Sequence, residues 1–172
     1  HIGHGRAAVV GSNRPKPVLG GLTMRFMNQR VEVKALLPTA QDIRYSEIVT
    51  VGVGVELDNA GADITDFFDF DFDAARITIS MDPFDVDGEY EGPSSSTLSF
   101  GSFEFSGFSF TDIDDTIPDI IGVQVGTSDL NAPDFEAAGV TFDADTIFVN
   151  LTGVTLVQSS ALQSKITIDV TF

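Results

Sequence analysis

The chain has no cysteine and no tryptophan, and its only two histidines are His1 and His4. Without cysteine, neither disulfide bonds nor thiolate chemistry are available. A Ser-His-Asp triad would need a histidine from the N-terminus. Two carboxylates could serve a glycosidase as acid and base, but close pairs arise by chance among twenty-six acids. We therefore expect a protein that is not an enzyme and has no catalytic residues.

Positive charge is scarce after the first 34 residues. Residues 1–34 carry a net charge of +5, whereas residues 35–172 carry −22, within a total of −17. Nucleic acid and anionic lipid surfaces both attract basic proteins, so we expect neither as a partner. Such acidity suits a solvated surface, multivalent cations or a cationic partner.

Long apolar runs are missing too, because no stretch approaches the roughly 18 residues of a membrane span. We therefore expect no membrane-spanning segment. The sequence opens with His1 rather than Met, which fits either the removal of a leader peptide or a sequence that starts within a longer precursor. Secretion to the cell surface or an extracellular matrix is the resulting expectation.

What is abundant is phenylalanine, with fifteen copies, and six residues show how it is used. From Phe68 to Asp73 phenylalanine and aspartate alternate strictly. Successive side chains of a strand point to opposite faces, so the three rings share one face and the three carboxylates the other. On a helix the same residues would form no apolar stripe. The stretch therefore predicts a strand with buried rings and a charged outer face.

Weaker alternation recurs along the chain and predicts about ten strands, separated by Gly, Pro, Asn and Asp signals. A change of parity at Ser106 and Gly107 predicts a β-bulge. No 3.6-residue period is sustained. The spacing favours an all-β fold, a two-sheet antiparallel β-sandwich or jelly-roll-like domain over residues 22–172. We expect its core to contain Phe68, Phe70, Phe72, Val51, Val53, Val55, Ile147, Val149, Ile168 and Val170.

Residues 1–21 are rich in Gly, Pro and Arg and lack the alternation of a core strand. We expect an extended N-terminal arm. Sandwich sheets have open edges that can accept an added strand, and a cationic arm is attracted to an anionic body. The arm is therefore predicted to pair with a neighbouring copy, through residues drawn from Ala7, Ala8, Val9, Val10, Val18, Leu19, Leu22, Met24 and Phe26.

Calcium is the metal that the acidic loops would suit, since Ca²⁺ takes six to eight oxygen ligands. The best candidates alternate along one loop and precede or follow Gly88: Asp85, Asp87, Glu89 and Glu91. Their spacing does not match the twelve-residue EF-hand loop. A solvated acidic loop without a bound ion explains the same residues, and both interpretations stay open.

Two segments, residues 37–57 and 139–153, together with the Phe-Ser-Gly-Phe step at 105–108, resemble secreted bacterial β-rich proteins of the PEP-CTERM sorted type. The resemblance covers about residues 31–172. It implies export and an extracellular or matrix role, and it implies no reaction. No sorting tail is present in the sequence.

Together these observations predict a non-enzymatic extracellular structural subunit. It would assemble head to tail with copies of itself, into a filament or matrix, by N-terminal β-strand addition. The alternative is a calcium-dependent module that binds extracellular polysaccharide. Such sites usually stack sugars on exposed Trp or Tyr, and the chain offers only Tyr45 and Tyr90, while its phenylalanines alternate as core residues. An arm that binds a neighbouring copy favours assembly, and a free or folded-back arm favours the binding module.

Overall fold

The computed structural model describes residues 26–57, 68–81, 95–126, 139–159 and 165–172. This part of the chain forms twelve β-strands and no α-helix, so it offers no helix with the length and apolarity to cross a bilayer. The strands are β1 (Arg30–Leu36), β2 (Ile43–Thr50), β3 (Val55–Leu57), β4 (Phe68–Asp73), β5 (Arg76–Met81), β6 (Ser95–Ser99), β7 (Gly107–Asp112), β8 (Gly122–Val125), β9 (Val140–Phe142), β10 (Thr146–Asn150), β11 (Thr155–Ser159) and β12 (Lys165–Thr171).

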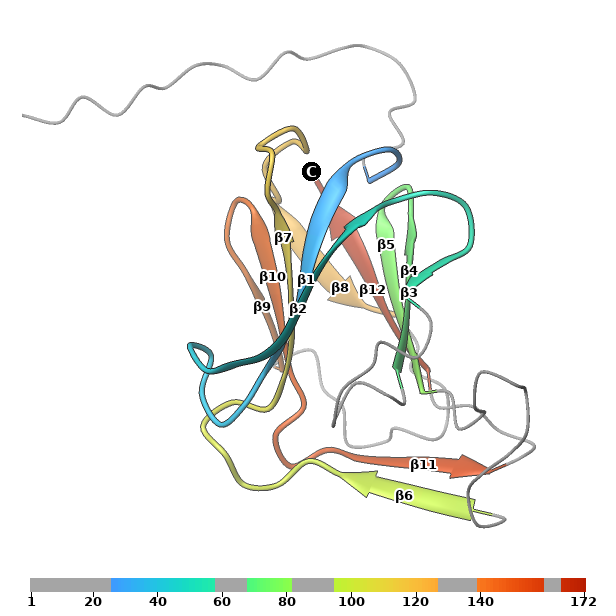
Figure 1. The fold of residues 1–172 in the computed structure, drawn as a ribbon, viewed down its shortest axis with the longest axis vertical. Helices are drawn as coiled ribbons and strands as arrows, with labels where there is room; N and C mark the ends of the chain where they lie inside the picture. The colour runs from blue at the N-terminus through green and yellow to red at the C-terminus, as the bar shows by residue number, and fades with distance from the viewer. Residues whose placement is uncertain (1–25, 58–67, 82–94, 127–138, 160–164) are drawn as a thin grey trace, which may run out of the picture.

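Ten of the strands form two five-stranded sheets, and every pairing is antiparallel. Sheet A has the order β2-β1-β7-β10-β9, and sheet B has the order β3-β4-β5-β12-β8. Figure 1 shows the two sheets facing each other, with β6 and β11 forming a separate two-stranded ribbon below them. The predicted two-sheet antiparallel β-sandwich is confirmed.

The Phe/Asp strand is β4, a central strand of sheet B. Phe68, Phe70 and Phe72 are all buried in the core. On the opposite face Asp73 is exposed and Asp71 half-buried, but Asp69 is buried. Each buried ring contributes about 1.5–3 kcal/mol relative to an exposed one, so this strand is a main source of the sandwich's stability.

Aromatic rings join the two sheets across the interior. Phe108 of β7 packs edge-on against Phe68 at 5.1 Å and against Phe70 at 4.9 Å between ring centroids. Phe110 does the same against Phe70 at 5.7 Å and against Phe72 at 5.5 Å. Edge-to-face pairs add to area burial, so the five rings act as one interlocked row.

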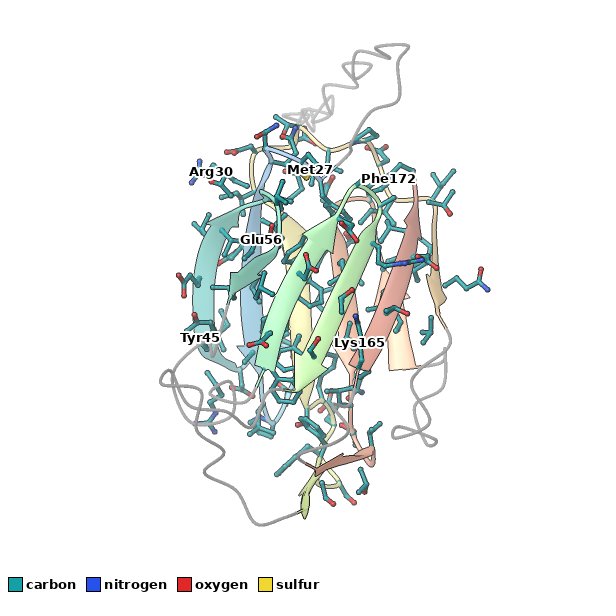
Figure 2. The ribbon with its side chains drawn as sticks, turned by 90° about the vertical axis from the view of Figure 1, so that its right-hand side faces the viewer. Met27, Arg30, Tyr45, Glu56, Lys165 and Phe172 are labelled. Atoms are coloured by element: carbon teal, nitrogen blue, oxygen red, sulfur yellow. The ribbon has the colours of Figure 1, made fainter. Side chains whose placement is uncertain are left out.

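Phe26 closes one end of the sandwich. Its ring lies 5.9 Å from Phe72 and 5.3 Å from Phe172, and its N–H donates to the carbonyl of Ala74 in the β4–β5 turn. Figure 2 shows the adjoining Met27 at the same end as Phe172. The part of the chain that the structure describes therefore begins at an anchored, buried residue.

The predicted core is confirmed for Val51 and for the predicted residues of β4, β10 and β12, but it is wrong for Val53 and Val55. Val53 is 98% exposed and Val55 is 52% exposed. The alternation through residues 49–57 indicated one long strand, whereas the chain leaves sheet A after Thr50 and enters sheet B at Val55. Gly54, with a φ of +94°, sits in this crossover, and the left-handed region that glycine tolerates allows the turn.

The predicted bulge at Ser106 and Gly107 is also wrong, because β7 begins at Gly107 and no strand precedes it directly. Phe105 lies in the connecting loop, buried, with its ring 6.4 Å from that of Phe148. Phe148 alternates with buried neighbours in β10, so it points to the outer face of sheet A. The alternation of apolar residues therefore changes phase between Phe105 and Phe108 because Phe105 packs on the outer face of sheet A, whereas Phe108 belongs to β7 and faces the core.

Candidate functional site

Exposed apolar side chains collect along the margins of the sandwich. On one margin, β2 carries Ile43, 55% exposed, and Ile48, 50% exposed. Val53 and Val55 follow directly in the crossover to β3. We call this margin, defined by Ile43, Ile48, Val53 and Val55, the β2–β3 edge. Figure 2 shows Tyr45 of β2 and Glu56 of β3 on this side of the molecule.

The opposite margin has a smaller apolar group. Ile121, just before β8, is 67% exposed, and Phe142 at the end of β9 is 41% exposed. β8 and β9 are the last strands of sheets B and A on that side and lie against each other. We call this margin, defined by Ile121 and Phe142, the β8–β9 edge.

Of the four edge strands, β2 is the longest, with eight residues, and β1 is its one described strand partner. The N–H of Val51 donates to the carbonyl of Gln29, one residue beyond the Arg30–Thr50 pair. Hydrogen-bonded pairs alternate along an antiparallel ladder. Ser46, Ile48 and Thr50 therefore direct their backbone N–H and C=O groups away from β1, toward the side where no other described strand pairs with β2.

Side chains brace β2 against β1. The Ser46 hydroxyl donates to Glu32 at 2.8 Å, and Lys34 forms an ion pair with the same carboxylate at 2.8 Å. The Tyr45 hydroxyl donates to Glu47 within β2. Partial burial, followed by this hydrogen bond and by the negative charge of Glu47, raises the pKa of Tyr45 to about 12. The open strand is thus held in an extended shape.

Glu56 fixes the crossover between the sheets. Its carboxylate accepts hydrogen bonds from the N–H of Gly52 and from the N–H of Phe72, each at 2.8 Å. The register of β3 and β4 shifts between Val55 and Leu57, so Glu56 satisfies a β4 donor where the ladder is irregular. The β2–β3 edge is therefore a fixed surface.

The acidic loops at the Phe26 end are organised by their own backbones. The Asp112 carboxylate accepts from the N–H of Ile117 at 2.7 Å and from that of Asp114 at 3.2 Å. The Asp143 carboxylate accepts from the N–H of Thr146 at 2.8 Å and from that of Asp145 at 3.0 Å. Short side chains that bond their own backbone in this way shape turns. Over the described ranges, no three His, Cys, Asp or Glu side chains gather as a metal site.

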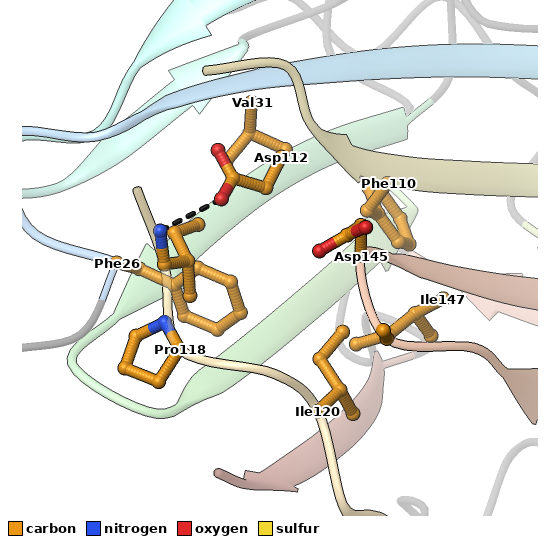
Figure 3. A pocket seen from close by; sticks show the side chains of 10 residues that line it. Phe26, Val31, Phe110, Asp112, Pro118, Ile120, Asp145 and Ile147 are labelled. Atoms are coloured by element: carbon orange, nitrogen blue, oxygen red, sulfur yellow. Dashed lines mark hydrogen bonds between the residues drawn. The ribbon is translucent and has the colours of Figure 1, made fainter. Parts of the chain in front are cut away.

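A small cavity lies beneath these loops (Figure 3). Asp112, Ile117 and Ile120, from the end of β7 and the segment before β8, line one side, and Asp145, between β9 and β10, lines the other. It encloses about 10 Å³, which is room for one water at most. Its lining is mainly apolar and includes Phe26. The cavity is a packing gap and too small for an organic ligand.

Most of the predicted site residues lie outside the described ranges. These are the calcium candidates Asp85, Asp87, Glu89 and Glu91, and the arm residues Ala7, Ala8, Val9, Val10, Val18, Leu19, Leu22 and Met24. Phe26 is described, and its side chain belongs to the core of its own chain. It therefore fixes the start of the described chain to its own sandwich.

Asn150 begins an Asn-Leu-Thr sequon, but its amide is used inside the fold. Its Oδ1 accepts from the N–H groups of Thr152 and Ser106, at 3.0 and 3.3 Å. Its Nδ2 donates to the carbonyl of Glu104 at 3.5 Å. The side chain thus ties the loop before β7 to the end of β10.

The sequence did not predict the β2–β3 edge as a site. The apolar alternation of residues 49–57 begins only after residues 43–48, which are mainly charged and polar and form most of β2. The sequence does contain one signal of an exposed apolar side chain at this edge. Ile48 and Val49 are adjacent, so only one of them can face the core if both lie in a strand.

A scan against protein-family models gives no match, and searches of curated proteins and of solved structures give no significant match.

Proposed function

We propose that this protein is a non-enzymatic extracellular structural subunit, which assembles head to tail with copies of itself by N-terminal β-strand addition. The observation that carries the proposal is the β2–β3 edge. An eight-residue strand there presents backbone hydrogen-bonding groups and two half-exposed isoleucines. Long edges of this kind are templates for pairing with another chain.

The distribution of charge along the chain also supports a second copy of the protein as the partner. Residues 1–25 contain Arg6, Arg14, Lys16 and Arg25 and no acid. The described residues hold five basic and fifteen acidic side chains. Three of the five bases, Arg30, Lys34 and Arg76, form ion pairs with acids of the same chain. An arm of one sign and a body of the other attract each other between copies.

The geometry of such a contact determines the kind of assembly. An arm from one copy and a sheet edge from the next are different surfaces, so the contact is heterologous. Heterologous contacts close into a ring when the rotation between copies permits, and otherwise they propagate as a filament. A filament or matrix outside the cell agrees with the resemblance to exported bacterial proteins.

The test compares the full chain with a chain that lacks residues 1–21. Size-exclusion chromatography with light scattering should show multimers for the full chain and a monomer for the shortened one. Circular dichroism should show that the shortened chain, which keeps the Phe26 anchor, retains its β-structure. A monomeric full chain, or multimers that survive the deletion, would overturn the proposal.

A matched variant separates charge from strand pairing. Replacing Arg6, Arg14 and Lys16 by glutamine keeps the apolar residues of the arm and removes its charge. This variant should still assemble, but more slowly and with less dependence on salt, because screening acts on charge and leaves backbone hydrogen bonds in place.

A further inference from the structure

Resting on the function proposed above, we infer that residues 7–10 of one copy add to β2 of the next as an antiparallel strand. In this arrangement Ala7 lies opposite Thr50 and Val9 lies opposite Ile48. The backbone groups that face away from β1 receive the new strand.

β2 is the best acceptor among the four edges. It has eight residues, whereas β3 and β9 have three each and β8 has four. β3 also has an irregular register. An added strand needs a run of regularly spaced donors and acceptors, and in the described part of the chain β2 supplies the longest one.

Within the arm, residues 7–10 are the best donor. They are Ala-Ala-Val-Val, an apolar run without proline, bounded by Gly5 and Gly11. Pro15 and Pro17 lack the backbone N–H that a ladder requires.

The length of chain between each apolar segment and Phe26 distinguishes residues 7–10 from the later apolar residues of the arm, because residues 7–10 can extend farther from their own sandwich. Fifteen residues lie between Val10 and the anchor Phe26, and an extended chain spans about 3.3 Å per residue step, so the arm reaches about 50 Å. An eight-residue strand is about 27 Å long. Residues 7–10 can therefore extend past the end of one sandwich and along a strand of the next.

The position of the anchor favours a second copy over the arm's own β2. The N–H of Phe26 is bonded to Ala74 of sheet B, whereas β2 belongs to sheet A. The crossover from Val51 to β3 lies at the same end, since Asn28 donates to the Val51 carbonyl at 2.8 Å. To reach its own β2, the arm would have to pass around this crossover.

The antiparallel direction follows from head-to-tail stacking. The chain enters the sandwich at the end where β2 finishes, as the bond between Asn28 and Val51 shows. When the next copy stacks beyond this end in the same orientation, the first residues of the arm lie farthest from their own sandwich. The arm then runs from the Thr50 end of the neighbouring β2 toward the Ile43 end, opposite to that strand.

Cysteine cross-linking tests the inference directly, because the chain has no cysteine of its own. A Val9→Cys copy is mixed with an Ile48→Cys copy in a glutathione redox buffer, and the products are separated without reductant. A disulfide needs Cα atoms within about 7 Å. We expect a disulfide-linked dimer of the two variants as the main product, and likewise for Ala7→Cys mixed with Thr50→Cys.

Matched pairs serve as controls. Ile121→Cys offers an exposed thiol on the opposite margin, and Val9→Cys should form little dimer with it. Leu19→Cys tests the later part of the arm, and it should form little dimer with Ile48→Cys. Equal coupling to Ile121, stronger coupling from Leu19, or preferred coupling of Val9 to Thr50 over Ile48 would each overturn the inference.

A second measurement requires no cross-link. Ile48→Pro removes an N–H that faces away from β1, so the β1–β2 ladder is kept. Ile48→Thr changes the same side chain and leaves that N–H in place. We expect the proline variant to stay monomeric and the threonine variant to assemble; assembly of both would overturn the inference.

The two proposals can fail separately. If the unmodified chain assembles but neither test points to β2, the proposed function stands and this inference fails. If the unmodified chain is monomeric, both fail.

Discussion

Replacing Phe70 by alanine should remove the centre of the aromatic row between the sheets. Phe70 is fully buried and touches both Phe108 and Phe110 across the interior. Phenylalanine-to-alanine changes in a core cost about 3–5 kcal/mol, because lost burial is combined with a cavity. For a domain of this size each kcal/mol lowers Tm by about 2–4 °C. We therefore expect Tm to fall by about 6–20 °C.

The assay is urea and thermal unfolding followed by far-ultraviolet circular dichroism, since the chain has no tryptophan for fluorescence. Phe103→Ala is the matched control, because the same side chain is exposed there. Surface substitutions usually change stability by less than about 0.5 kcal/mol. A loss below about 1 kcal/mol for Phe70→Ala, or an equal loss for both variants, would refute the interlocked core.

Four further predictions address other parts of the molecule. Gly107→Ala would place a Cβ 1.9 Å from the carbonyl oxygen of Val149, so urea unfolding should show a loss of about 1–3 kcal/mol. Glu56→Gln keeps one acceptor oxygen in place of two, and the same assay should show a loss of about 1 kcal/mol. Because the folded pKa of Tyr45 is raised to about 12, its contribution to stability is complete below about pH 10 and is lost as pH rises toward 12. A tyrosinate absorbance titration and the flatter alkaline stability profile of Tyr45→Phe would check this. If the acidic residues of 82–91 bind Ca²⁺ as predicted, Tm should rise with Ca²⁺ and much less with equal Mg²⁺, and equal responses would indicate charge screening alone.

The sequence was sufficient to predict a strand and its buried face where a two-residue alternation dominates. Strict alternation of phenylalanine and aspartate located β4 and the buried face of sheet B. Alternation also located β10 and β12 and their core residues. In each of these strands one face meets the other sheet and the residues of the opposite face are less buried, which is the condition under which a two-residue period can be recognised.

The sequence pattern failed to predict the structure where the backbone changes direction without a change in residue composition. Val53 and Val55 continue the alternation of Val49 and Val51, yet the chain passes from one sheet to the other between them. The ribbon of β6 and β11 was missed because Ser95–Ser99 is rich in serine, which is typical of loops. The open edge of β2 depends on strand order, and strand order is set by pairings far apart in the sequence that a local pattern does not report.

The most direct test of the account is electron microscopy of the purified full chain beside the chain lacking residues 1–21. The account predicts regular head-to-tail polymers for the full chain, with density for one additional strand beside β2 that connects to a neighbouring copy, and single particles for the shortened chain. Full-length particles that stay single, or polymers in which the density beside β2 is empty, would contradict it.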